Sequence, residues 1–298
     1  MNILVTGSNG FIGDHVSKYL KGRGHYVIGL GRKEKAFNTD SISEYIKCDI
    51  GGTDFEGLKN VFQRIDAVIH LAADMRKEPY LIDVISANCT GTQRLLELCE
   101  ANGVNVFLQL SSLPVIGKPL YHPITEEHPI HPYTVYHITK RTEELLANYA
   151  YEYHGVRTAS FRISAPIGTR VNPNTIFPTL IRKAIEGDDL ILMGNGTRKQ
   201  NYLYVYDIAR CLELSLTAEN VHGVYNLTSN LLLSNYELAE KVIATMNSKS
   251  SIVLRGEDPM DDYVWDASIC RIIEDSGYCP SAILEDIIKE YALWLKEQ

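Results

Sequence analysis

The sequence predicts the α/β fold class: a doubly wound parallel sheet covered by helices, followed by a smaller α/β lobe. Two observations carry this prediction. Short apolar runs alternate with helix-like segments through the first half of the chain, and the runs are apolar on both faces, as in a covered parallel sheet. A glycine-rich turn also follows the first run, where such a fold needs a tight strand-to-helix connection.

The first half of the chain supplies the elements of the large sheet. We expect its strands at residues 2–6, 26–30, 46–50, 67–71, 104–110 and 157–163. Helical spacing of apolar residues predicts the intervening helices: from Ile12 to a stop near Gly24, around Leu58, over 82–101 and from Tyr136 onward. This order assigns residues 1–163 to the large domain.

The second half, residues 164–298, has a more mixed pattern. We expect helices at 177–186, 207–216, 234–246 and 282–296, and strands at 190–193, 224–227 and 251–254. Ser234 and Glu237 form a capping-box signature at the start of one of these helices. No linker or repeat separates the halves, so the boundary is soft and late segments can return to the large sheet.

The stretch VTGSNGFIG places Gly7, Gly10 and Gly13 between the first strand and the first helix. Glycine tolerates positive φ and close approach to the backbone, and a helix start offers free N–H groups to a pyrophosphate. The spacing is G-x-x-G-x-x-G, not the commoner G-x-G-x-x-G, and three glycines can simply build a tight turn. Their position after the first strand favours a dinucleotide site of the Rossmann type.

Tyr136 and Lys140 are four residues apart at the start of a long helical pattern, and therefore lie on one side of the helix. An ammonium beside a phenol favours the phenolate and lowers its pKa, which suits a general acid and base near neutral pH. Tyr-x-x-x-Lys is frequent by chance, so a surface pair is the alternative. Tyr133 is a rival tyrosine, but no lysine follows it by four residues.

The bulk properties limit the classes of partner. A formal net charge of −8 over 298 residues argues against nucleic acid and anionic membrane surfaces. The 6 cysteines form no C-x-x-C pair, so we expect no disulfide framework and no metal site. No basic region precedes the apolar N-terminal residues, and no apolar run approaches the roughly 20 residues of a membrane span. We therefore expect a soluble, cytoplasmic protein.

Seven motifs together resemble the extended short-chain dehydrogenase/reductases, especially their NAD(P)-dependent nucleotide-sugar epimerases, dehydratases and reductases. The motifs are TGSNGFIG (6–13), CDI (48–50), HLAA (70–73), NCTGT (88–92), LSSLPVIG (110–117), YHITK (136–140) and GNGTRKQNYLYVYDIA (194–209). The resemblance covers nearly the whole chain. It implies an NAD(P)-binding Rossmann domain at 1–163 and a mainly substrate-binding lobe at 164–298.

The resemblance also implies roles for individual residues. Tyr136 matches the catalytic acid/base, Lys140 the residue that lowers its pKa and binds the cofactor ribose, and Ser112 the hydroxyl that hydrogen-bonds the reacting oxygen. Hydride transfer at a carbinol needs its proton removed, or supplied in reverse, and this pair can do so with nicotinamide as hydride partner. The other residues expected to bind the cofactor are Gly7, Gly10, Phe11, Ile12, Gly13, Asp49, Ile50, Leu71, Ala72, Ala73 and Asn88. Ser112, Asp49 and Asn88 also have purely structural interpretations in turns and loops.

The end of the second strand bears on the choice of cofactor. Relatives that select NAD usually carry an acid there, on the adenosine ribose. Here Gly31 occupies that place, followed by Arg32 and Lys33. Arg32 can bind a 2′-phosphate or stack on adenine, with a solvated basic loop as the alternative. The pattern favours NADP(H) over NAD(H).

The substrate positions depart from the family pattern. Gln200 and Asn201 stand in place of an Arg-Asp pair, and Ala165 in place of an asparagine that helps to hold the substrate diphosphate. The residues expected to contact substrate are Ser112, Lys199, Gln200 and Arg255. For the two cations among them, plain surface exposure is the alternative.

The expected reaction is hydride transfer at a sugar carbon, C4 above all, of a nucleotide-activated sugar. Family dehydratases carry Asp-Glu where this chain has Leu113 and Pro114, so a 4,6-dehydratase is disfavoured. A 4-ketoreductase fits Gly31 and Arg32 best. A nucleotide-sugar 4-epimerase, a reductase of a small non-nucleotide carbonyl compound and a non-catalytic NAD(P) sensor are the alternatives.

The resemblance implies a homodimer, because many relatives pair through two long helices. These correspond to residues 82–101 and 136–153 of this chain. The apolar face of the second helix, with Leu145, Leu146 and Tyr149, can instead belong to the core.

Overall fold

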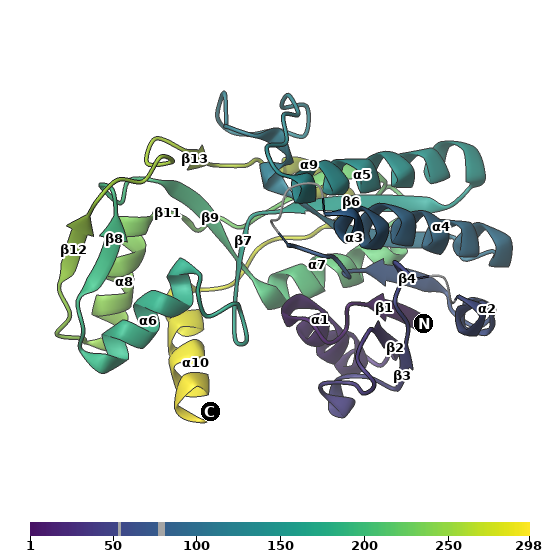
Figure 1. The fold of residues 1–298 in the computed structure, drawn as a ribbon, viewed down its shortest axis with the longest axis horizontal. Coiled ribbons are helices and arrows are strands. Elements are labelled where there is room, and N and C mark those ends of the chain that lie inside the picture. The colour runs from purple at the N-terminus through teal and green to yellow at the C-terminus, as the bar shows by residue number, and fades with distance from the viewer. Residues whose placement is uncertain (53–54, 77–80) are drawn as a thin grey trace.

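A seven-stranded parallel sheet forms the centre of the larger lobe (Figure 1). The protein is represented by a computed structural model that describes residues 1–52, 55–76 and 81–298. In sheet order the strands are β10 (Gly223–Leu227), β6 (Arg157–Ile163), β5 (Val106–Ser112), β4 (Ala67–His70), β1 (Asn2–Thr6), β2 (Tyr26–Gly31) and β3 (Glu44–Lys47). The order reverses between β1 and β4, which is the topological switch point of a doubly wound sheet. The predicted fold class is confirmed.

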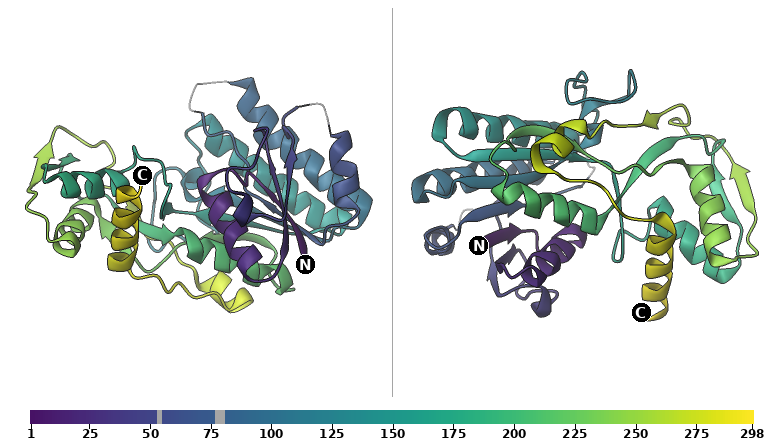
Figure 2. Two further views of the ribbon diagram at one scale, coloured as in Figure 1. Left: turned by 90° about the horizontal axis from the view of Figure 1, so that it is seen from below. Right: turned by 180° about the vertical axis from the view of Figure 1, so that it is seen from behind.

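Helices cover both faces of the sheet because successive side chains of each strand point to opposite faces (Figure 2). In β1, Ile3 and Val5 join the core beneath α1 (Phe11–Gly22) and α7 (Val205–Thr217). Leu4 joins the core on the opposite face. That face is covered by α2 (Glu56–Phe62), α4 (Gly91–Asn102) and α5 (Val135–His154).

The smaller lobe surrounds a separate apolar core. Its strands are β7 (Ala165–Ile167), β8 (Leu190–Met193), β9 (Lys199–Tyr204), β11 (Leu232–Ser234), β12 (Ile252–Arg255) and β13 (Val264–Trp265). Its helices are α6 (Ile176–Glu186), α8 (Asn235–Met246) and α10 (Leu284–Lys296). The capping box at the start of α8 is confirmed, since Ser234 and Glu237 each bond the backbone of the other.

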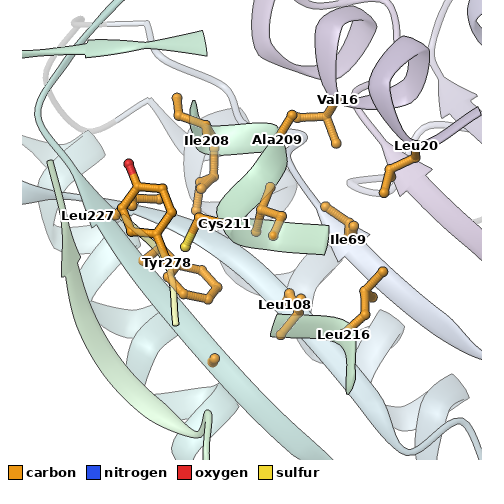
Figure 3. Packing of buried hydrophobic residues seen from close by; sticks show 14 of the residues in the cluster. Val16, Leu20, Ile69, Leu108, Ile208, Ala209, Cys211, Leu216, Leu227 and Tyr278 are labelled. Carbon is orange, nitrogen blue, oxygen red and sulfur yellow. The ribbon is translucent and has the colours of Figure 1, made fainter. Parts of the chain in front are cut away.

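Segments from the second half of the chain return to the large sheet. β10 pairs with β6 at the sheet edge, and α9 (Cys270–Ser276) packs against β10. Figure 3 shows Ile208 of α7 in one apolar cluster with Val16 of α1 and Ile69 of β4. The larger lobe is therefore completed by chain that follows residue 164.

Several expected elements differ in extent. The strand expected at 46–50 lies earlier, at β3, because the Asp49 carboxylate caps a turn by accepting the Gly51 N–H. The helix expected at 82–101 is divided into α3 (Ile82–Ile85), a π-helical turn at Ser86–Thr90 and α4. The strands β7, β9, β11 and β13 and the helix α9 were not expected from the sequence. No helix in the described ranges is both long and apolar enough to span a membrane.

Candidate active site

The glycine turn joins β1 to α1 at the switch point of the sheet. Gly7 has φ of +69°, and a Cβ on it would lie 2.8 Å from the Ala72 nitrogen. A Cβ on Gly13 would lie 2.1 Å from the Gly7 carbonyl oxygen. Gly10 is the N-cap of α1 and has no side chain to cap the helix. The free N–H groups of the first helical turn therefore have no side-chain cap. The uncapped helix start is the feature that the predicted pyrophosphate site requires.

The segment that follows β4, residues 71–76 (the β4 loop), lies beside the glycine turn. The backbone N–H groups of Leu71 and Ala72 both donate to the Thr6 hydroxyl at 3.1 Å. Ala73 follows and is exposed. Thr6 therefore fixes this segment beside the first strand.

Asn88 holds the same segment from behind. Its side-chain carbonyl accepts the Asp74 N–H at 2.7 Å. Its amide donates to the Asp74 carbonyl at 3.0 Å and to the Thr139 hydroxyl at 2.9 Å. The side chain is buried and these three bonds fasten the loop to α5. A positioning role explains Asn88 fully.

The remaining residues of the expected cofactor set are spread around the turn. Phe11 and Ile12 are half-buried at the start of α1, while Ile50 is buried in the core beneath α4. Asp49 is exposed. Of these, Asp49 alone carries a charged side chain.

At the end of β2, any side chain at Gly31 would require the Tyr45 hydroxyl to move. A Cβ there would lie 2.9 Å from the Tyr45 hydroxyl oxygen. That hydroxyl donates to the Lys33 carbonyl at 2.9 Å and accepts from Asn9 at 3.0 Å, so it is held in place. Arg32 is exposed next to it. Arg76, and more weakly Arg32, lower the pKa of Asp74, which places the Arg32 charge on the side of the β4 loop.

Ser112, Tyr136 and Lys140 lie where β5 ends and α5 begins. Thr134 caps α5 by accepting the His137 N–H at 3.2 Å, which sets the helix start just before Tyr136. Lys140 reaches back to β5, and its ammonium donates to the Leu110 carbonyl at 2.9 Å. Ser112 is two residues further along the same strand, and its side chain does not cap the 3₁₀ turn that follows.

Tyr136 does not have the lowered pKa that the sequence predicts. Burial raises its pKa, Lys140 opposes this effect, and the charge of Glu143 adds to it. The Lys140 ammonium lies 6.0 Å from the centre of the Tyr136 ring. The predicted effect of Lys140 on the pKa is therefore present, but burial outweighs it.

Glu143 is a member of the site that the sequence prediction did not include. The Lys140 ammonium donates to its carboxylate at 2.9 Å, and both side chains are buried. The i, i+3 spacing on one helix places them together, so the pattern Tyr-x-x-x-Lys-x-x-Glu contained the information.

Of the substrate positions expected in the smaller lobe, two have partners within that lobe and one is exposed. The Lys199 ammonium is 3.9 Å from Glu237, and the Gln200 amide donates to the Tyr202 hydroxyl at 2.9 Å. Arg255 is exposed at the end of β12. None of the three lines either of the two cavities described below. Ala165 pairs with Tyr202 in the sheet.

A cavity of about 430 Å³ lies in this lobe at the N-terminus of α6. Residues around it include Asn174, Thr175, Leu192, Met193, Arg198 and Asn235. Its charges are mixed, because Arg198 lies 3.4 Å from Asp258 and Glu257 also lines the wall. A second cavity of about 580 Å³ lies between α5 and the β10 edge and includes neither Ser112 nor Tyr136.

Residues 3–228 match the model of the NAD dependent epimerase/dehydratase family. This chain belongs to that family. It is therefore an enzyme, and the resemblance seen in the motifs is confirmed. The non-catalytic alternative is set aside with this assignment.

Two curated members of the family show how far the similarity extends. The chain is 29% identical to dTDP-glucose 4,6-dehydratase from Streptomyces griseus, over 98% of this chain and 93% of that protein. It is 28% identical to a putative UDP-glucose 4-epimerase from Methanocaldococcus jannaschii, over 99% of this chain and 98% of that protein. The similarity to these two proteins thus includes the smaller lobe.

A solved structure of the family has the same fold throughout. The UDP-glucose 4-epimerase from Thermotoga maritima, solved with UDP-glucose, superposes with a TM-score of 0.88 at 23% identity. The match covers 100% of this chain and 99% of that one. Both lobes of this family member therefore have counterparts in the solved enzyme.

Proposed function

We propose that this family member transfers a hydride at C4 of a nucleotide-activated sugar, and that its net reaction is 4-epimerisation. One observation carries the proposal: α5, which holds Tyr136 and Lys140, is bonded through Lys140 to the strand that ends at Ser112, and no acid pair follows Ser112. The group supports oxidation and reduction of a carbinol without elimination.

The proposed chemistry is proton transfer by Tyr136. In its deprotonated form the tyrosine takes the proton of the C4 hydroxyl, and in the reverse step it returns that proton to the new carbinol. Ser112 donates a hydrogen bond to the reacting oxygen, and the Lys140 ammonium stabilises the phenolate. A nicotinamide cofactor held at the glycine turn would supply the hydride acceptor.

Elimination is disfavoured by the residues that follow Ser112. A dehydratase needs an additional acid and base to remove water. Leu113 and Pro114 are the first two residues of the 3₁₀ turn Leu113–Ile116, and neither side chain can exchange a proton. This argument stands although the Streptomyces griseus relative is a 4,6-dehydratase. Of the two activities in the family description, epimerisation is then the one compatible with the site.

We assign the nucleotide part of the substrate to the cavity at the N-terminus of α6. The Thr175 side chain does not cap this helix, which leaves its first N–H groups available to an anion. Leu192 and Met193 provide apolar wall, and Arg198 provides a cation. Such a combination suits a base and a phosphate together. The enzymes from Methanocaldococcus jannaschii and Thermotoga maritima, both described as UDP-glucose 4-epimerases, support this substrate class.

A 4-ketoreductase is the second candidate, supported by the end of β2. Gly31 provides no acid there, and the exposed Arg32 can meet the 2′-phosphate of NADP(H). A reductase uses a dissociable reduced cofactor, whereas an epimerase returns the hydride to its own substrate. NADP(H) preference would therefore favour reduction.

The deciding experiment offers the purified protein UDP-, dTDP- and GDP-sugars with NAD⁺, NADH, NADP⁺ and NADPH. Interconversion of C4 epimers without net change in cofactor absorbance supports the epimerase. Stoichiometric NADPH oxidation with a 4-keto nucleotide sugar would show a 4-ketoreductase instead of an epimerase. Turnover of small carbonyl compounds alone would overturn the nucleotide-sugar assignment.

We also propose that the protein forms a homodimer through α4 and α5. The two helices pack side by side on the outer face of the sheet (Figure 1). Large apolar side chains on α3 and α5 are exposed there, namely Ile82, Ile85, Ile138, Leu145, Tyr149 and Tyr153. An apolar surface of this kind is typical of a protein interface.

A further inference from the structure

Glu143 is a buried charge for which the proposed reaction provides no role. It is 1% exposed and sits one helical turn beyond Lys140. One of its carboxylate oxygens accepts the Lys140 ammonium at 2.9 Å. The other, Oε1, is buried without a hydrogen-bond partner among the described residues. A half-satisfied buried carboxylate is costly, so a purely stabilising function is a poor explanation for it.

The Lys140 ammonium is divided between Glu143 and the backbone. Its two hydrogen bonds go to the Glu143 carboxylate and to the Leu110 carbonyl, each at 2.9 Å. Neither goes to Tyr136, whose ring centre is 6.0 Å away. The orientation of the lysine is therefore determined by the glutamate and by β5.

Burial and neighbouring charges change the pKa of each of the three residues Tyr136, Lys140 and Glu143. Burial tends to lower the pKa of Lys140, but Glu143 and Tyr136 outweigh burial and raise it. Burial raises the pKa of Glu143, with Lys140 acting against it. Lys140 lowers the pKa of Tyr136 and Glu143 raises it, after the larger effect of burial.

Other titratable groups near this trio have smaller or separate roles. Among described residues, Glu144 on the same helix acts on both Lys140 and Glu143, but it is itself paired with Arg162. Cys89, from the π-helical turn, is influenced by Glu143 and Lys140 after burial. His70, from β4, is influenced by Lys140 and is held neutral by burial. None of them bonds the ammonium.

We infer that Glu143 is a positioning residue: it holds Lys140 in place, and its negative charge sets the pH at which Tyr136 gives and takes its proton. This inference rests on the proposed catalytic role of Tyr136. With Glu143 ionised, the lysine charge seen by the phenol is partly cancelled and the tyrosine stays protonated to higher pH. Removing the charge of Glu143 leaves the ammonium unopposed.

The first test measures Tyr136 itself, without substrate or cofactor. Protein labelled with ¹³Cζ-tyrosine is titrated by NMR, and the signal missing from Tyr136→Phe identifies the residue among the 18 tyrosines. In Glu143→Gln, which keeps the size of the side chain, the titration midpoint falls by about one pH unit. Glu143→Asp keeps the charge and retains a midpoint close to that of the wild type.

Glu152→Gln is the matched control, since it makes the same change at an exposed position of α5. Circular dichroism at each pH restricts the comparison to folded protein. A signal that appears earlier only in Glu143→Gln supports the inference. A Tyr136 signal with no earlier titration in Glu143→Gln than in wild type, or an equal shift in Glu152→Gln, overturns it.

The second test uses the pH profile of C4 oxidation. This direction needs the phenolate, so kcat/KM rises with pH through the Tyr136 titration. In Glu143→Gln the rising limb moves to lower pH by the same interval as the NMR midpoint. If no nucleotide sugar is turned over, the proposed function fails while the NMR result still decides the role of Glu143. A profile that does not move in an active Glu143→Gln enzyme contradicts the inference.

Discussion

At the scale of single residues, the site depends on ionisable side chains that are buried. Lys140 and Glu143 are buried together, and His70 is buried one strand away. His70 bonds the Thr6 hydroxyl at 2.7 Å and the Thr92 hydroxyl at 3.0 Å. Because Thr6 also receives the backbone of the β4 loop, this polar group supports one side of the proposed cofactor site.

Removing the phenolic oxygen of Tyr136 tests the proposed chemistry. Tyr136→Phe is expected to lower kcat at least about a hundredfold, the usual contribution of a positioned acid/base, and to leave cofactor affinity nearly unchanged. Steady-state kinetics and calorimetry measure the two effects. Tyr133→Phe is the control, as this neighbouring tyrosine is exposed and has no lysine four residues later. Near-normal activity in Tyr136→Phe would eliminate the proposed mechanism.

The His70 environment predicts a pH dependence of stability. Burial, with a smaller contribution from Lys140, lowers its pKa from 6.5 to about 3. Between pH 6.5 and about 3, His70 is protonated in the unfolded chain but neutral in the folded protein. The free energy of unfolding therefore falls as the pH drops from 6.5 towards 3. The limiting slope is about 1.4 kcal/mol per pH unit.

We expect His70→Gln to lose this part of the acid sensitivity. The variant is less stable at neutral pH, but its free energy of unfolding declines less between about pH 6 and 4 than that of the wild type. Urea titrations at several pH values measure the difference. His131→Gln, at an exposed histidine, should keep the wild-type slope. Parallel curves for wild type and His70→Gln would count against a buried neutral imidazole.

At the scale of elements, the ends of β2 and β5 decide what the sheet can bind. β2 ends at Gly31 against Tyr45, and β5 delivers Ser112 and the Leu110 carbonyl to α5. Both ends lie at the carboxyl edge of a parallel sheet, where doubly wound folds bind ligands. The chemistry at the end of each strand depends on one or two residues located there.

Arg32 predicts the cofactor preference at the end of β2. If it meets a 2′-phosphate, Arg32→Ala weakens NADPH binding about tenfold or more, in the range of a charge-assisted hydrogen bond, and spares NADH. Fluorescence titration with both cofactors measures this. Lys35→Ala, in the same exposed loop, is the control. Equal losses for NADPH and NADH would instead indicate stacking on adenine, and no loss would leave Arg32 as a surface residue.

At the scale of the whole molecule, the lobes are joined beside the glycine turn. The Arg170 guanidinium pairs with Asp14 of α1 at 2.5 Å and covers the Phe37 ring at 3.6 Å. Arg170 has φ of +66°, an uncommon conformation for a residue other than glycine. The His15 ring bonds the Thr169 hydroxyl at 2.9 Å. The segment that enters the smaller lobe is thereby fixed against the first helix.

The exposed apolar face of α5 predicts the state of assembly. Wild-type protein should sediment as a dimer, and replacing both Leu145 and Tyr149 by Glu should give a monomer, because buried unpaired charges oppose association. Leu254→Glu, an exposed apolar position in the smaller lobe, should stay dimeric. Analytical ultracentrifugation checks all three. A monomeric wild type would refute the proposed interface.

The sequence by itself determined the local features of this protein. Apolar runs separated by helical patterns specify the sheet, because a strand that is buried on both faces consists of consecutive apolar residues. Gly7, Gly10 and Gly13, and the spacing of Tyr136 and Lys140, are likewise local, so the glycine turn and the helix position of the pair followed from neighbouring residues alone.

Only the tertiary structure decided properties that depend on distant segments. The pKa of Tyr136 moved opposite to expectation, because burial and Glu143 are set by packing and not by a four-residue spacing. The return of β10 and α7 to the large sheet depends on pairing across the chain. The Gln200 amide bonds the Tyr202 hydroxyl, and this contact depends on packing within the smaller lobe. Local patterns fix elements, whereas solvation and electrostatics arise from the whole fold.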